Sequence, residues 1–411
     1  MKKFSAWINW KYVLFLSVFL IICLEVFGRV YLSLVLGKSP HLKFQFDSYR
    51  IYSHVPHFHE GHGTKDWIVI NGQGFRRNTD VAKTRTPNSF RIFLMGGSAA
   101  HGISTAPPYP LVHIYMDETI DFYLEQKLKS KYPGKDIEVI NAAVTGYQVF
   151  QHTAYILAEL LDYHPDLIIF MDGINDHYFN NPAFDYFGEN KYQFWKPRLQ
   201  DASLGGLIDY SFLWMSNFSG FARGYHTWRL QRDATSHDNL PSRPFIQYSN
   251  VNELIEGHKA AARKMFLRSI ATNISILQQN GIDTIISLQP MLVLRNTNLL
   301  SKTEKDFMQS DDNARTLYPV VASELSELTA KYNVPFIDLN VAFNNDEYKQ
   351  EQLLVDYCHL SPLGAQVIAD SLVATVDSIL VKRLKKWNSG QGERVKSGWL
   401  TPSPIPTPAS P

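Results

Sequence analysis

The residues of this chain best suited to chemistry are a serine, a glycine, an asparagine and an Asp/His pair, each placed after an apolar run. Ser98 follows FLMGG, Gly146 follows VINAAVT, and Asn175 follows IFMDGI. Asp356 and His359 stand three residues apart in DYCHLSPLG. A serine hydroxyl is a weak nucleophile and needs an adjacent base, which a histidine held by a carboxylate can supply. These residue types predict acyl transfer through a serine.

Five short apolar runs, which resemble buried strands, alternate with longer stretches that suit helices. The runs are RIFLMGG, IEVINAA, LIIFMDG, DTIISLQ and VPFIDLN. Near-continuous apolar strands are covered on both faces, and intervening helices make consecutive strands parallel. The sequence therefore predicts an α/β fold with three α/β/α layers around a doubly wound, flavodoxin-like parallel sheet of about five strands. Ligands bind at the carboxyl ends of such strands, where the candidate residues stand.

Each candidate also has an ordinary structural interpretation. A serine after two glycines is a common helix N-cap, an Asn-Asp pair after a strand is typical of a turn, and Asp-x-x-His before a helix can be a cap. The catalytic hypothesis depends on their meeting at one edge of one sheet. His101 is a rival base, three residues after Ser98, which we expect to point into packing. Asp176 and His177 are expected to be turn and pocket-lining residues.

The four stretches around these residues resemble the defining blocks of the SGNH hydrolases, also called GDSL-type esterases and lipases. That family carries Ser, Gly, Asn and His in this order, and the matches are FLMGGSAAHG, VINAAVTGYQ, IFMDGINDHYF and DYCHLSPLGAQVIA. The first block departs from Gly-Asp-Ser-Leu, because Gly97 precedes the serine and Ala99 follows it. Gly-Gly-Ser is familiar in the membrane-anchored bacterial branch, which INGQGFRRN and the lysine-flanked apolar N-terminus also resemble.

The resemblance implies a role for each matching residue. Ser98 would be the nucleophile, His359 the base, and Asp356 the carboxylate that orients the imidazole. The backbone N–H groups of Ser98 and Gly146 and the side-chain amide of Asn175 would form the oxyanion hole. The resemblance implies neither a metal nor a cofactor.

We therefore expect a serine esterase or acylhydrolase that cleaves a carboxylic ester outside the cytoplasm, with a small acyl group such as acetyl favoured. The substrate would be an ester of a lipid or an acylated carbohydrate. If a sugar hydroxyl resolves the acyl-enzyme, the chain is instead an O-acyltransferase for an envelope polysaccharide. A non-catalytic envelope scaffold or binding protein is a third alternative, against which the complete residue set argues. Activity that needs neutral His359 is expected to rise through roughly pH 6 to 7.

The N-terminal segment combines basic residues with an apolar run. Three lysines within the first eleven residues are followed by residues 12–24, which carry no charge. Glu25 and Arg29 come next, one helical turn apart, so they can partly neutralise each other and let a membrane span continue. The lysines place the N-terminus in the cytoplasm, so we expect an uncleaved signal anchor and an extracytoplasmic catalytic domain. A cleaved signal peptide and a buried soluble helix are the alternatives.

Composition divides the chain into four parts. We expect a cytoplasmic stub and signal anchor at 1–37, a loop-rich lead-in segment at 38–89, the hydrolase domain at 90–387 and a disordered Pro/Ser/Thr-rich tail at 388–411. The domain contains an aromatic-rich insertion at 178–249, which would be a lid over the site or would pack on the sheet edge. Within the lead-in, the cluster of His54, His57, His59 and His62 lacks zinc-site spacing and is expected in a surface loop.

The overall charge excludes one class of partner. Forty basic residues against 39 acidic ones give a net charge of +1, so no global field favours nucleic acid. The only two cysteines, Cys23 and Cys358, stand far apart in different contexts, so we expect no disulfide. The sequence carries no signal for an oligomeric state.

Overall fold

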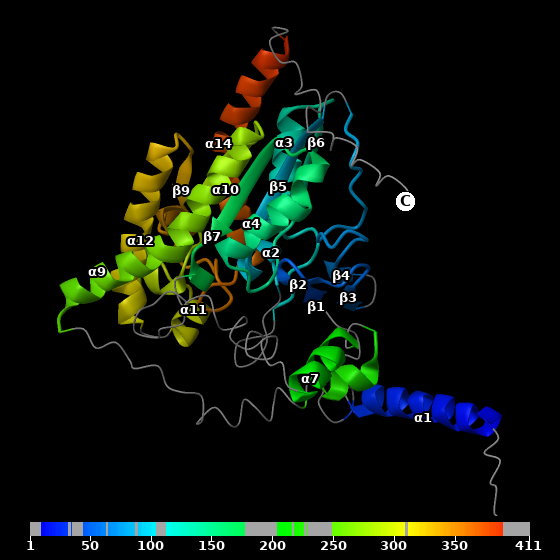
Figure 1. Cartoon of the computed structure of the whole chain (residues 1–411). Helices are drawn as coiled ribbons and strands as arrows, with labels where there is room; N and C mark the ends of the chain where they lie inside the picture. The colour runs from blue at the N-terminus through cyan, green and yellow to red at the C-terminus, as the bar shows by residue number, and fades with distance from the viewer. Residues whose placement is uncertain are drawn as a thin grey trace, which may run out of the picture.

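A parallel five-stranded sheet forms the centre of the molecule (Figure 1). The computed structural model describes residues 10–31, 34, 44–62, 65–86, 89–103, 112–176, 204–215, 218–225, 228, 249–308 and 311–388. The sheet strands are β5 (Ser89–Gly96), β6 (Asp136–Asn141), β7 (Leu167–Asp172), β8 (Asp283–Leu288) and β9 (Phe336–Asp338). Their order, β6-β5-β7-β8-β9 with every pair parallel, is that of a flavodoxin-like sheet. The predicted fold class is confirmed.

Helices cover both faces of this sheet. On one face lie α4 (Val149–Ala158), η2 (Leu160–Tyr163), η4 (Arg263–Leu267), α10 (Arg268–Gln279) and α12 (Asp312–Lys331). On the other lie α2 (Ser98–His101), α3 (Ile120–Lys131), α13 (Leu339–Phe343) and α14 (Pro362–Asn388). Further helical elements are α9 (Val251–Ala262), which runs into η4, and η5 (Leu292–Leu294), α11 (Lys302–Phe307) and η6 (Asp346–Tyr348).

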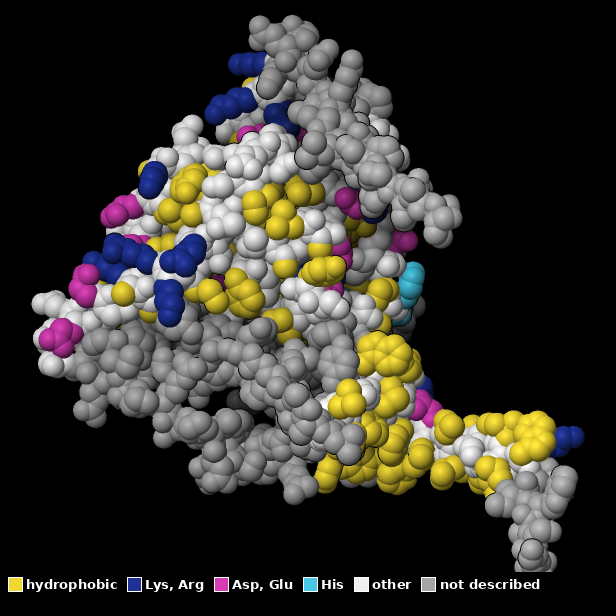
Figure 2. Space-filling model, in the orientation of Figure 1, with side chains coloured by type: hydrophobic (Ala, Val, Ile, Leu, Met, Phe, Trp, Pro, Cys, Tyr) yellow, Lys and Arg dark blue, Asp and Glu magenta, His cyan; other side chains and the backbone are white. Residues whose placement is uncertain are grey.

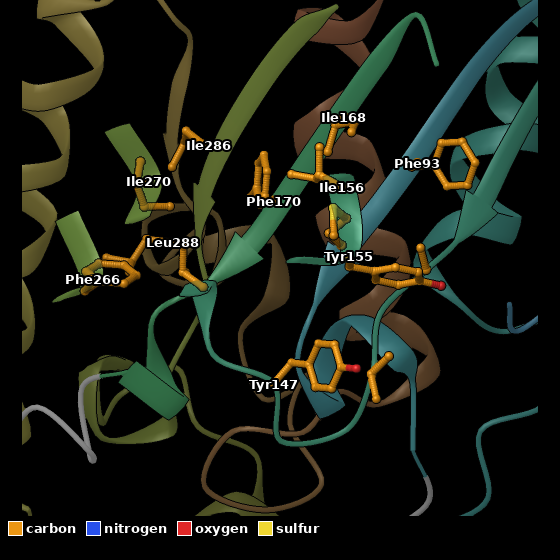
Figure 3. Close-up of a cluster of buried hydrophobic side chains, with 14 of the residues drawn as sticks. Phe93, Tyr147, Tyr155, Ile156, Ile168, Phe170, Phe266, Ile270, Ile286 and Leu288 are labelled. Atoms are coloured by element: carbon orange, nitrogen blue, oxygen red, sulfur yellow. The ribbon is translucent and has the colours of Figure 1, made fainter. Parts of the chain in front are cut away.

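The strands are apolar throughout because both of their faces are buried. Along β5, Phe93 and Met95 pack with one helical layer, whereas Ile92 and Leu94 pack with the other. Figure 3 shows the first of these layers, in which strand side chains such as Phe170 meet aromatic and aliphatic side chains of the helices. Each such side chain contributes about 1.5–3 kcal/mol of burial free energy. The sheet is therefore a rigid platform for residues at its edge.

Two small antiparallel hairpins lie in the lead-in segment, which we predicted to be loop-rich. They pair β1 (Phe44–Asp47) with β2 (Ile51–His54), and β3 (His59–His62) with β4 (Lys65–Val69). His54 is buried and its ring lies 4.7 Å from that of His101. The prediction that the histidines lie in a surface loop is therefore wrong for His54. The strands are only four or five residues long and rich in polar side chains, so their sequence carries little strand signal.

Two described helices are long and apolar enough to cross a membrane: α1 (Trp10–Val30) and the first 24 residues of α14. Half of the α14 window is buried, because this helix covers the sheet. The window in α1 is only 6% buried. Of these two, α1 is the helix whose apolar surface is left uncovered.

Candidate active site

Ser98 lies at a tight turn between β5 and α2. A β-carbon at Gly96 would come within 2.4 Å of the Met171 carbonyl oxygen, and one at Gly97 within 2.5 Å of the Asn175 Nδ2 atom. Larger residues would collide at both positions, which explains the glycine pair. The turn leaves Ser98 partly exposed, whereas its neighbours Gly97 and Ala99 are buried.

A chain of hydrogen bonds joins Ser98 to His359 and His359 to Asp356. The Nε2 atom of His359 lies 2.7 Å from the Ser98 Oγ atom, and Nδ1 lies 2.5 Å from the Asp356 Oδ2 atom. The other oxygen of Asp356 accepts the backbone N–H groups of Cys358 and His359 at 2.8 and 2.7 Å. The carboxylate is thus fixed by backbone. With the Nδ1 proton directed at Asp356, Nε2 can accept the serine proton.

The surroundings of His359 favour its charged form. Burial disfavours the charge, but the Cys358 sulfur, 3.8 Å from Nδ1, and the Asp356 carboxylate outweigh burial and raise the pKa of His359 above its ordinary value of 6.5. Burial would raise the pKa of Asp356, but its hydrogen bond to His359 and the histidine charge lower it instead. This direction predicts that activity rises at a pH above 6 to 7, because the base works only when neutral.

Gly146 follows β6 and Asn175 lies in the helical turn 174–176 that follows β7, and the two segments meet beside Gly97. Gly146 adopts a positive φ of 75°, which suits glycine. The side-chain amide of Asn175 donates a 2.8 Å hydrogen bond to the carbonyl of Tyr147, the residue after Gly146. An asparagine amide has two protons, so the second one can serve a ligand. All five sequence-predicted residues therefore lie on segments that the fold brings to the same sheet edge.

The other two described candidates, His101 and Asp176, are buried. His101 is 1% exposed and stacks near His54, which confirms that it points into packing. Asp176 is 2% exposed, and its carboxyl accepts the backbone N–H of Val149 at 3.3 and 3.4 Å. Burial, together with the nearby charge of Asp172, raises the pKa of Asp176 well above its ordinary range. Asp176 thus ties the helical turn of Asn175 to the start of α4, and His177 lies outside the described residues.

Arg76 is a positioning residue that sequence reasoning missed. Its buried guanidinium donates to the backbone carbonyls of His101 and Gly102, the latter at 2.6 Å, at the carboxyl end of α2. It also donates to the carbonyls of Trp67 and Ile114. Arg76 thereby clamps the short helix that begins with Ser98. The residue stands in INGQGFRRN, but one arginine among several carries no signal for this role.

One group of described side chains has ligand atoms close enough for a metal ion: Asp356, Cys358 and His359, whose atoms lie within 4.8 Å of one another. However, Asp356 Oδ2 and His359 Nδ1 are already joined by a hydrogen bond, and Nε2 faces Ser98. These contacts fit a proton-transfer pair, and a metal would have to break them. The arrangement can therefore activate a hydroxyl without a metal.

Comparison with known proteins identifies related sequences and folds. A model of the GDSL-like lipase/acylhydrolase family matches residues 94–367, more than half of the chain. No curated protein matches the chain significantly. Solved structures with similarity include an acetyl xylan esterase (14% identity, covering 70% of this chain and 100% of that chain, TM-score 0.36). Others are a variant acetyl xylan esterase from Geobacillus stearothermophilus (15%, 71% and 96%, TM-score 0.39) and an alpha/beta hydrolase from the metagenome of Lake Arreo, Spain (14%, 71% and 96%, TM-score 0.38). The family match spans every candidate residue from Ser98 to His359.

Proposed function

Because the chain belongs to the GDSL-like lipase/acylhydrolase family and is a serine ester hydrolase, we propose that Ser98, His359 and Asp356 are its catalytic triad. The observation that supports this assignment is the unbroken hydrogen-bond chain from the Ser98 hydroxyl through the imidazole to a carboxylate fixed by backbone. A nucleophile within reach of a base, with the base oriented by a third group, is the arrangement that covalent acyl transfer requires.

The reaction proceeds through an acyl-enzyme. As the Ser98 Oγ atom attacks the ester carbonyl, its proton passes to His359 Nε2, and Asp356 stabilises the resulting imidazolium. The C–O bond to the alcohol then breaks, and the leaving oxygen takes the proton from Nε2. Water next attacks the acyl carbonyl and gives a proton to Nε2, which returns it to Ser98 as the carboxylic acid leaves. Every proton that leaves Ser98 or water is returned within the reaction cycle, so the cycle needs no cofactor.

The oxyanion of each tetrahedral intermediate is held by three donors. These are the backbone N–H groups of Ser98 and Gly146 and the second amide proton of Asn175. Fixed donors cost no reorganisation during the reaction, and one of them is typically worth about 3–4 kcal/mol of transition-state stabilisation. The contact of Asn175 with the Tyr147 carbonyl supports this role, because it aims the amide at the loop that contains Gly146.

The substrate is an ester with a small acyl group such as acetyl, carried by a lipid or a carbohydrate outside the cytoplasm. Small acyl groups are favoured because no long apolar groove can be read from the sequence of the aromatic-rich insertion. The 21 residues of α1 rise about 30 Å, enough to span a bilayer core. We therefore assign residues 1–37 to the anchor, 38–89 to the lead-in and 90–387 to the extracytoplasmic catalytic domain.

The test is the hydrolysis of p-nitrophenyl acetate, butyrate and octanoate by the full chain in detergent micelles. The native chain should turn over the acetate fastest, and Ser98→Ala should abolish turnover. Ser378→Ala, an exposed serine on α14, is the matched control and should behave as the native chain does. Full turnover by Ser98→Ala would contradict the proposal, and faster cleavage of octanoate would contradict the acyl preference.

A second measurement separates hydrolysis from acyl transfer. The products are analysed with and without an oligosaccharide acceptor at equal ester consumption. Hydrolysis predicts release of the free acid in both cases. Accumulation of acylated oligosaccharide in place of free acid would assign the O-acyltransferase alternative.

A further inference from the structure

The described part of the aromatic-rich insertion packs against the end of α1 that leads into the catalytic domain. Glu25 of α1 accepts hydrogen bonds from the Ser219 hydroxyl at 2.8 Å and from the backbone N–H groups of Gly220 and Phe221 at 2.7 and 3.2 Å. The same carboxylate pairs with Arg29 at 2.8 Å. The one acidic side chain of α1 is thus neutralised and hydrogen-bonded at this contact.

Small residues let the two backbones approach closely. A β-carbon at Gly28 of α1 would fall 2.3 Å from the Phe221 Cα atom, and one at Gly220 would fall 2.5 Å from the Arg29 side chain. Close approach through glycines is typical of helices that associate within membranes. The contact between α1 and the insertion therefore combines close backbone packing with a carboxylate, that of Glu25, whose charge is paired and hydrogen-bonded.

The described part of the insertion contains a helical hairpin. Its first arm is α7 (Leu204–Met215), and its second is helical from 220 to 225. The ring of Phe212 lies 4.4 Å from that of Tyr225 and 6.1 Å from that of Phe221. The arms therefore hold each other through aromatic packing, and the hairpin docks on α1 as a unit.

The hairpin leaves large apolar side chains uncovered. Five of them have exposed fractions between 41% and 61%: Leu207, Ile208, Trp214, Phe218 and Trp228. Figure 2 shows that this apolar surface is continuous with the apolar surface of α1. In Figure 1 the two elements lie side by side below the α/β body. A contiguous exposed apolar surface of this kind indicates a site of interaction with another molecule or with a membrane.

We propose that the hairpin formed by residues 204–215 and 218–225, together with Trp228, is a second membrane-contacting element, which docks on α1 and inserts its exposed aromatic and aliphatic side chains into the outer interface of the bilayer. The inference rests on the proposed membrane anchoring by α1. A bilayer fits as the partner of the hairpin, because the apolar surface of the hairpin continues the apolar surface of α1. Tryptophan and other aromatic side chains are also those that favour the interface.

The electrostatics of the contact between α1 and the hairpin also favours a bilayer as the partner of the apolar surface. An unpaired carboxylate or an unpaired backbone N–H is costly in the low-dielectric part of a bilayer. Glu25 and the N–H groups of residues 220 and 221 satisfy each other, and the longer side chain of Arg29 can reach toward water. The junction thus removes the polar groups that would oppose insertion. Two contacts with the bilayer instead of one would also hold the catalytic domain at the membrane surface.

The test is photo-crosslinking of the full chain in phosphatidylcholine/phosphatidylglycerol vesicles that contain a trace of radiolabelled phospholipid. A benzophenone amino acid replaces Trp214 or Phe218 in the hairpin, or Phe19 in α1 as the positive control. Leu157 and Val341 are the negative controls, because they are at least as exposed as Trp214 and Phe218 but lie on the catalytic domain. All five sites are exposed, so the substitutions should leave folding intact.

Labelled lipid should attach at positions 214 and 218 with a yield like that at position 19, and several-fold above that at 157 and 341. Yields at 214 and 218 no higher than at 157 and 341 would overturn the inference, as would a crosslinked dimer of the chain in place of lipid. Loss of the lipid adduct at position 19 would instead refute anchoring by α1 and with it the premise. The failure of the inference and that of the proposed localisation are therefore distinguishable.

The docking on α1 is tested separately by Gly28→Leu, whose side chain would collide with the backbone at Phe221. This variant should reduce the lipid adduct at position 218 several-fold while leaving that at position 19 unchanged. An unchanged adduct at position 218 would overturn the claim that the hairpin reaches the bilayer through α1.

Discussion

Two Asp/His pairs lie near the carboxyl edge of the same sheet, and of these two only the pair of Asp356 and His359 also contacts a serine hydroxyl. His359 bonds Asp356 through Nδ1 and Ser98 through Nε2, and its side chain is 13% exposed. His152 bonds Asp172 at 3.0 Å, but it is fully buried, and its Nδ1 atom has no hydrogen-bond partner among the described residues. A carboxylate and an imidazole alone do not make an active site. The difference lies in what the second nitrogen faces and whether a substrate can reach it.

The largest effect is expected from replacing the histidine of the first pair. His359→Gln removes the base that contacts Ser98, so kcat should fall by about 10⁶-fold, as when a triad acts as a unit. Stability should change by less than about 1 kcal/mol, because Asp356 keeps its two backbone hydrogen bonds. Steady-state kinetics and thermal unfolding measure both. Residual activity of a tenth or more would remove His359 from the mechanism.

Asp356→Asn should be the next most severe change. An amide in place of the carboxylate no longer fixes the tautomer or stabilises the imidazolium, so kcat should fall by about 10⁴-fold. The carboxylate also raises the pKa of His359, so its loss should move the rise of kcat/KM with pH to lower pH. The pH profile of the variant checks this sign. A rise at the native pH or above it would show that Asp356 does not tune the base.

A smaller loss is expected from Asn175→Ala, which affects the oxyanion rather than the proton. Removing one such donor typically lowers kcat by about 10²–10³-fold, with little change in KM. The pH profile should keep its native position, because the pair of Asp356 and His359 is untouched. A large increase in KM at unchanged kcat would instead assign Asn175 to ground-state binding.

The smallest effect on activity is expected at the second pair. His152→Gln leaves the buried Asp172 carboxylate without its imidazole partner, so the free energy of unfolding should fall by about 1–3 kcal/mol. The kcat per folded molecule should stay close to native, because His152 does not contact Ser98. Denaturant titration and active-site counting measure the two quantities. A loss of kcat as large as that of His359→Gln would erase the contrast between the pairs.

The edge of the sheet that carries the candidate site was predictable because its signals are local. Unbroken apolar runs such as LIIFMD reflect strands buried on both faces, and the residues that follow them necessarily share the carboxyl edge. Spacing within a single loop also placed Asp356 beside His359. Four short sequence blocks thus specified both the fold class and the candidate site.

The supporting residues were not predictable, because their partners are distant in sequence. Arg76 reaches carbonyls 25 and 26 residues further on, and nothing in its own neighbourhood signals this contact. The buried pair of His152 and Asp172 joins α4 to the end of β7 in the same way. The contact of Glu25 with Ser219 spans 194 residues. Tertiary contacts of this kind have no local period or motif.

The most direct test of the central claim is covalent labelling of the native chain by a fluorophosphonate, followed by peptide mass spectrometry. The Ser98 hydroxyl, activated by His359, should take one label in step with the loss of esterase activity, and both His359→Gln and Ser98→Ala should prevent labelling at this site. Complete inactivation with the label on another residue, or full activity with Ser98 labelled, would contradict the assignment of Ser98 as the nucleophile.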